Sequence, residues 1–105
     1  MIYNEQTEYS FWIDWPREDS DPADELADVR LNLGDREYSA PFATLNYAGA
    51  MVRKNKEDCG CPAFYMRGLV IVKEITKEIV KNTIDYMMKE HELEDCFTEW
   101  NGSGT

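Results

Sequence analysis

The chain has 105 residues, a length that supports one hydrophobic core and therefore a single domain, residues 1–105. Hydrophobic residues make up 43% of the sequence, which is enough to build that core and too many for wholesale disorder. Asp and Glu number 21 against 11 Lys and Arg, giving a net charge of −10. That charge argues against a nucleic-acid-binding surface and against attraction to an anionic membrane.

The sequence predicts neither a signal peptide nor a membrane helix. No basic leader precedes an apolar stretch at the N-terminus, and the longest apolar run, residues 69–72, is far shorter than a membrane helix requires. The three cysteines are an odd number, and Cys59 and Cys61 are separated by one residue, unlike the even disulfide framework of small secreted domains. We therefore expect a reduced, cytoplasmic protein.

Residues 8–15 alternate in polarity, which predicts a half-buried strand with Trp12 on its outer face. Pro16 ends this strand. Residues 17–28 then contain six acidic side chains and one basic one, and they predict a solvated acidic loop spanning about residues 16–28, with one helical turn at 23–27.

A β-hairpin is expected next. Residues 29–33 alternate in polarity, and Gly34 with Asp35 forms the kind of two-residue turn that joins antiparallel strands, so residues 37–42 should return as the third strand. Because Pro41 cannot donate a ladder hydrogen bond, we expect this segment at a sheet edge or at a strand end.

Thr44 is the expected N-cap of a helix whose apolar residues recur at positions 45, 48, 51 and 52. Residues 55–62 should form a loop that carries Cys59, Gly60 and Cys61. The following segment, residues 63–73, contains the run 69–72, which is apolar on both sides and therefore predicts a central strand covered on both faces.

The last helix has the clearest pattern, an apolar face running through residues 77–90 with Thr76 as its cap and Ile75 as a staple onto Val80. Residues 101–105 predict a flexible tail. The resulting fold class is α+β, a mainly antiparallel sheet of about four strands with two helices, in the order β-β-β-α-β-α.

Catalytic and metal-binding side chains are few. Cys59, Cys61, His91 and Cys96 could supply a three-sulfur, one-nitrogen zinc set, but their spacing differs from the usual zinc knuckle, and Cys96 is expected to fill the core near Phe97. The chain has one His and lacks a phosphate-binding loop, a nucleophile elbow and a zinc-protease helix. We expect neither an enzyme nor a cofactor, and a Cys-dependent metal-binding or redox-linked protein stays as an alternative.

The acidic segments are more informative. Residues 17–28 carry a net charge of −5 and residues 89–99 a net charge of −4. Clustered charge of one sign speeds association with an oppositely charged protein, and an exposed Trp is a common anchor in interfaces. The sequence therefore predicts an acidic protein-binding module with a basic partner. The expected partner-binding residues are Asp19, Asp21, Asp24, Glu25 and Asp28, with Trp12 or Trp15 as the apolar anchor.

From about residue 28 to residue 97 the chain resembles small bacterial immunity proteins of polymorphic-toxin systems, the contact-dependent inhibition type. The likeness lies in the strand pair around Gly34, the sequence Phe42-Ala43-Thr44 leading into a helix, the strand at 69–72, and the final helix with its acidic end and Phe97. It implies a protein that neutralises a basic toxin domain, such as a nuclease, by direct binding, and it carries over no catalytic residue. We expect the chain to be a monomer or a homodimer. A DNA-mimicking inhibitor stays as a second alternative.

Overall fold

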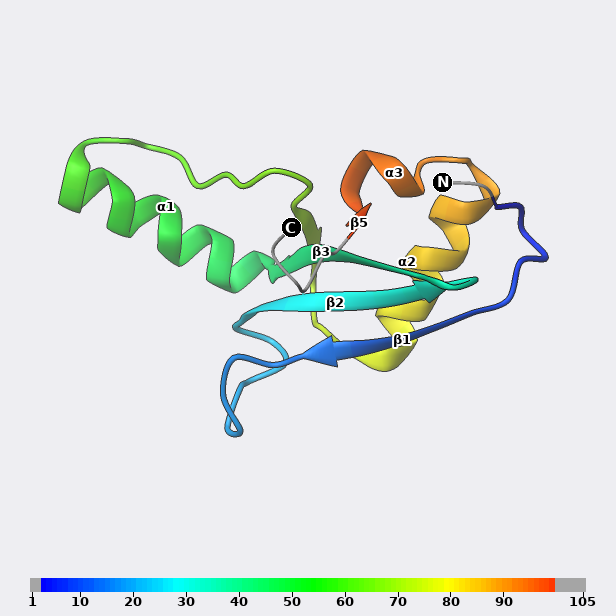
Figure 1. The fold of residues 1–105 in the computed structure, drawn as a ribbon. Coiled ribbons are helices and arrows are strands. Elements are labelled where there is room, and N and C mark those ends of the chain that lie inside the picture. Colours follow the sequence, from blue (N-terminus) through cyan, green and yellow to red (C-terminus); the bar gives the residue numbers. More distant parts are fainter. Residues whose placement is uncertain (1–2, 100–105) are drawn as a thin grey trace.

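The structure is a computed structural model, and it describes residues 3–99. The chain forms a mixed five-stranded sheet. Figure 1 shows α2 against one face of this sheet and α1 extending away from it. The strands follow the order β1-β2-β3-β4, and β5 pairs with β3 beside β4. The elements are β1 (Tyr9–Asp14), β2 (Leu26–Leu33), β3 (Arg36–Thr44), α1 (Leu45–Cys59), β4 (Val70–Val72), α2 (Lys77–Lys89), α3 (Leu93–Cys96) and β5 (Thr98–Glu99).

The α+β class and the predicted order of the first six elements are confirmed, and α3 and β5 are additions at the C-terminal end. The predicted tail, residues 101–105, lies outside the described residues. Among residues 3–99, no helix combines the length and the apolar character that crossing a bilayer requires.

The core lies between the sheet and α2. Alternate residues of β2 and β3 point toward α2. In return, α2 buries one side chain per turn, Val80, Ile84 and Met88, as its sequence pattern predicts. Thr76 caps α2 by accepting a hydrogen bond from the Ile79 backbone N–H at 3.1 Å. The buried hydrophobic residues of this core are Ala27, Val29, Leu31, Leu33, Tyr38, Ala40, Phe42, Ile75, Val80, Ile84, Met88, Leu93 and Phe97.

The prediction that Pro41 marks a sheet edge or strand end is wrong, because β3 is an inner strand and Pro41 lies within it. On one side β3 pairs along its length with β2. On the other side, β5 pairs with Tyr38 and Ser39 and β4 pairs with residues 42–44, and no described residue pairs with Pro41 between them. A missing N–H is tolerated at such a gap between two partner strands.

The central, doubly covered strand predicted for residues 63–73 is also wrong. Only Val70–Val72 is strand, it pairs with β3 alone, and Ile71 on its outer side is 51% exposed. Val70 and Val72 therefore pack against the core, while Ile71 between them is an apolar side chain that faces solvent.

Two loop boundaries differ from the predictions. α1 continues to Cys59 and ends where Gly60 adopts a left-handed conformation with φ of 77°, so residues 55–59 are helix and not loop. β2 begins at Leu26, so the acidic loop is shorter than predicted, and residues 23–27 form no helical turn.

Gly68 and Gly34 both have positive φ angles, 74° and 67°, but their surroundings differ. A Cβ at Gly68 would lie 2.5 Å from the backbone oxygen of Cys96, whereas a Cβ at Gly34 would meet nothing within 4 Å. An Ala at either position is strained, because an L-residue disfavours a left-handed backbone conformation. Only Gly68→Ala also places a Cβ against the backbone of another segment. Chemical denaturation should show Gly68→Ala to be less stable than Gly34→Ala by about 1–3 kcal/mol. Equal losses would contradict the close approach of residue 68 to α3.

Candidate protein-binding site at one end of the sheet

Three strand ends meet at one end of the sheet. β1 finishes there opposite the start of β2, with Asp14 aligned to Asp28, and the end of β3 lies beside them, with Ala43 aligned to Leu26. The loop from β1 to β2 crosses this end. Residues 14–28 hold seven carboxylates and one Arg, so this end of the sheet is strongly negative. We call Asp14, Trp15, residues 16–25, Asp28 and the adjoining Trp12 the acidic corner.

The acidic loop is held in place by backbone atoms. The Glu25 N–H donates to the Thr44 hydroxyl at 3.1 Å, and the Glu25 carbonyl accepts from the Thr44 N–H at 3.0 Å. The Pro22 carbonyl accepts from the Ile75 N–H at 2.8 Å, just before α2. The Ala23 carbonyl accepts from the Asn46 side chain at 3.1 Å, in the first turn of α1. Four hydrogen bonds thus fix the loop to the end of β3 and to the starts of both long helices.

Asp14 and Asp28 occupy directly opposite positions on neighbouring strands, an arrangement that is destabilising for like charges. Arg30 lies next to them and donates to Asp14 at 3.2 Å, which leaves the three side chains with a net charge of −1. An additional cation from outside the chain would relieve the remaining repulsion. Sequence reasoning singled out Asp28 but missed Asp14, because only the strand register shows that the two carboxylates are neighbours.

The two tryptophans border hollows at the acidic corner. Trp12 projects from the sheet face opposite α2 and is 44% exposed, as predicted. Trp15 is half-buried and lines two hollows. The larger, about 580 Å³, is bounded by Phe11, Trp12, Ile13, Trp15, Pro22, Ile75, Thr76 and Lys77. The smaller, about 310 Å³, is bounded by Asp14, Trp15, Pro16, Leu26, Ala27, Asp28 and Met66.

Glu25 does not face solvent with the other loop carboxylates. Its side chain is 7% exposed and accepts from the Arg17 guanidinium at 2.8 Å and from the Leu26 N–H at 3.1 Å. Burial alone would raise the pKa of this carboxyl, but the hydrogen bonds from Arg17, Leu26 and Ser20 and the charge of Arg17 outweigh it, so the pKa is lowered. Glu25 therefore stabilises the loop, and the carboxylates left to face a partner are Asp14, Glu18, Asp19, Asp21, Asp24 and Asp28.

The second acidic segment lies elsewhere. The acidic loop contacts the N-terminal end of α2 through Pro22, whereas residues 89–99 begin at the C-terminal end of the same helix. The two segments, which together hold nine of the ten excess negative charges, are thus separated by the length of α2 and do not form one surface.

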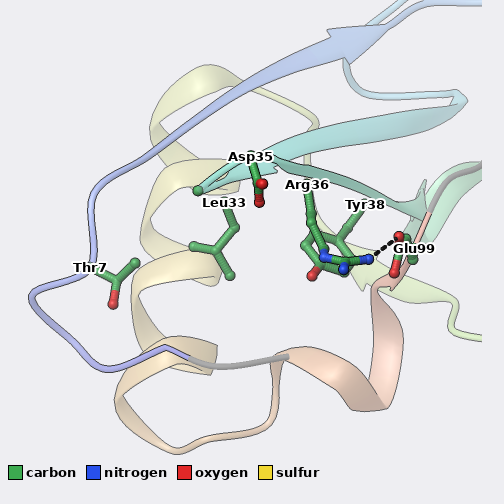
Figure 2. Close-up of a pocket in the computed structure, with 7 residues that line it drawn as sticks. Thr7, Leu33, Asp35, Arg36, Tyr38 and Glu99 are labelled. Carbon is green, nitrogen blue, oxygen red and sulfur yellow. Dashed lines mark hydrogen bonds and ion pairs between the residues drawn. The ribbon is translucent and has the colours of Figure 1, made fainter.

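A further hollow, about 480 Å³, lies at the opposite end of the β2–β3 hairpin and is drawn in Figure 2. It is bounded by Thr7, Leu33, Gly34, Asp35, Arg36, Tyr38 and Glu99. Its one Arg, Arg36, is paired with Glu99 at 2.8 Å, and the close-up shows that ion pair at the side of the hollow. None of the residues expected from sequence to bind a partner lies here.

The alternative metal set is not brought together. Within residues 3–99, no group of three or more His, Cys, Asp or Glu side chains is arranged to hold a metal ion. Cys59 is exposed at the end of α1, while Cys96 packs at the margin of the core beside Phe97, as expected. Burial and the nearby carboxylates of Asp95 and Glu92 raise the pKa of the Cys96 thiol.

Comparisons with models of known protein families, with curated proteins and with solved structures each found no match.

Glu25 should make stability depend on pH. Because its pKa is lower in the folded than in the unfolded chain, its contribution is complete above the unfolded value, about 4.3, and is lost as pH falls through the folded value. Glu25→Gln should cost about 1–3 kcal/mol in urea unfolding at pH 7 and much less at pH 3. Asp19→Asn, at a side chain that is 88% exposed in the same loop, is the control and should change stability little at either pH. A Glu25→Gln loss that is equal at both pH values would contradict this role.

Proposed function

We propose that this protein is an acidic protein-binding module that acts by occupying a basic partner protein, with the acidic corner as its docking site. The observation that carries the proposal is the meeting of an anchored acidic loop with two tryptophans around hollows of about 580 and 310 Å³. Apolar hollows bordered by charge offer both an anchor point and a steering field, the two components of a fast and specific protein interface.

The rigid attachment of the loop supports this proposal. Ordering a flexible loop on binding costs free energy, and a loop already held by four hydrogen bonds avoids much of that cost. Its exposed carboxylates are therefore presented in a fixed arrangement before the partner arrives. Such preorganised charge raises association rates by roughly 10- to 1,000-fold at low salt.

The resemblance to immunity proteins gives the partner a class. A toxin domain that cleaves nucleic acid needs a basic cleft to hold phosphates, and an acidic corner is complementary to such a surface. We therefore infer that the partner is a basic toxin domain and that binding blocks its activity. The direct test is to produce the C-terminal domain of a polymorphic toxin encoded beside this chain in bacterial cells, with and without this chain. The toxin domain alone should stop growth, and co-expression should restore growth and yield a stable complex.

Neutralising the corner should slow association. The triple variant Asp19→Asn, Asp24→Asn and Asp28→Asn removes three exposed charges and leaves Asp21, whose carboxylate accepts from the Ala23 N–H at 2.9 Å and shapes the loop. Stopped-flow mixing with the toxin domain should show an association rate about tenfold lower at low salt, with a flatter dependence on ionic strength.

The matched control is Glu90→Gln, Glu92→Gln and Asp95→Asn, which removes the same charge from exposed positions at the other end of α2. We expect it to change the association rate much less than the corner variant. Equal effects would mean that only the net charge of the chain matters, and that the corner is not the docking site.

Trp12 should determine how long the complex lasts. Truncating a central aromatic anchor typically costs about 2 kcal/mol or more, so Trp12→Ala should raise the dissociation rate about 30-fold with little change in the association rate. Tyr86→Ala removes an exposed aromatic on α2 away from the corner and serves as the control. Surface plasmon resonance measures both rates, and identical dissociation of the two variants would exclude Trp12 from the interface.

A further inference from the structure

Residues 45–69 form a projecting arm, made of α1 and the segment that runs back alongside it to β4 (Figure 1). The arm is held together internally. The Tyr47 and Phe64 rings meet edge to face with centroids 5.9 Å apart, and the Asn55 side chain donates to the Ala63 carbonyl at 2.8 Å. The arm is therefore a structured unit and not a loose loop.

The outer surface of the arm lacks a packing partner within the described chain. α1 has 15 residues and none of them is buried, although most helices in proteins owe their stability to burying an apolar face. Four of the seven large hydrophobic residues that are exposed in the described structure belong to the arm, namely Leu45, Val52, Tyr65 and Met66. Leu45 is 62% exposed and Tyr65 is 80% exposed.

The molecular dimensions agree with a projecting element. The radius of gyration is 14.6 Å, whereas a compact domain of this length has a radius of about 13 Å. The longest axis is 45 Å against 32 and 29 Å for the others. Of the two predicted helices, only α2 therefore covers the sheet, because α1 contributes no residue to the core.

The arm differs from the rest of the chain in charge. Residues 45–69 contain four basic and two acidic side chains, a net charge of +2, so the remaining residues carry −12. Three of the cations, Arg53, Lys54 and Lys56, are exposed and follow one another along α1. Each chain thus carries a basic arm with exposed apolar side chains next to an acidic corner with apolar hollows, and Met66 at the end of the arm lines the smaller of those hollows.

Both surfaces lie at the same end of the sheet. The arm leaves from the end of β3, and the Asn46 side chain at its base touches the acidic loop through the Ala23 carbonyl. A two-fold axis at this end would bring the arm of each chain to the acidic corner of the other. An isologous contact of that kind satisfies both surfaces in both chains at once and leaves none to extend into a filament.

We propose that the free protein is a two-fold symmetric dimer in which the arm of each copy docks on the acidic corner of the other. The net charge of −10 repels the two copies at long range, but salt screens that repulsion beyond about 8 Å at physiological ionic strength. The contact between arm and corner is short-range and of opposite charge, so it is screened less. The dimer itself does not depend on the proposed function, although both use the acidic corner, so a basic partner would have to displace the arm.

A charge-swap experiment tests this arrangement. The arm variant carries Arg53→Glu, Lys54→Glu and Lys56→Glu, and the corner variant carries Glu18→Lys, Asp19→Lys, Asp24→Lys and Asp28→Lys, all at exposed positions. In either variant alone, the arm and the corner have the same sign. When the two variants are mixed one to one, they can form a dimer of one copy of each. In that dimer each reversed surface faces a surface of opposite charge, so both contacts are attractive.

Sedimentation equilibrium should give the wild type a mass of twice the 12.2 kDa chain. Each variant alone should dimerise at least about tenfold more weakly, and the mixture should recover the dimer. Recovery would also show that both variants fold. Circular dichroism of each variant checks the fold independently of assembly.

Several outcomes would overturn the proposal. A wild-type chain that stays monomeric over the whole concentration range would do so, and so would a dimer that neither variant weakens, since pairing would then use another surface such as the free edge of β1. Two weakened variants that fail to recover on mixing would also contradict it. None of these results would affect toxin binding by the acidic corner, which is measured separately with the toxin domain.

Discussion

The buried hydroxyl of Thr44 is the contact on which the acidic end of the molecule depends. It accepts hydrogen bonds from the Glu25 N–H and from the Tyr47 N–H, both at 3.1 Å. The first bond fixes the end of the acidic loop to β3, and the second caps α1 and so sets the direction in which the arm leaves the sheet. One side chain at the last position of a central strand therefore places both the acidic corner and the basic arm.

Local patterns in the sequence were sufficient to predict most of the fold. The alternation of β1 and β2, the turn at Gly34 and the apolar stripe of α2 each depend on neighbouring residues, and each is confirmed. Elements that depend on distant partners could not be predicted in the same way. β5 has two residues and exists because it pairs with Tyr38 and Ser39, and β4 is limited to three residues by its single neighbour, β3.

The candidate site was predictable in composition but not in geometry. The acidic loop and Trp12 follow from the residue types and from strand alternation alone. The burial of Glu25 required knowledge of Arg17 as its partner, because a Glu among five other loop carboxylates looks like one more solvated charge. Asp14 entered the site only through its register with Asp28, a relationship across the sheet that no local pattern contains.

The loop of the acidic corner is attached almost entirely through its own main chain, by the carbonyls of Pro22 and Ala23 and by both backbone groups of Glu25. Side chains such as Glu18, Asp19 and Asp24 point outward and carry no part of that attachment. Substitutions at these positions can therefore accumulate without unfolding the domain. A chain built this way can acquire a new binding specificity by exchanging a few outward groups, while the same scaffold is inherited unchanged.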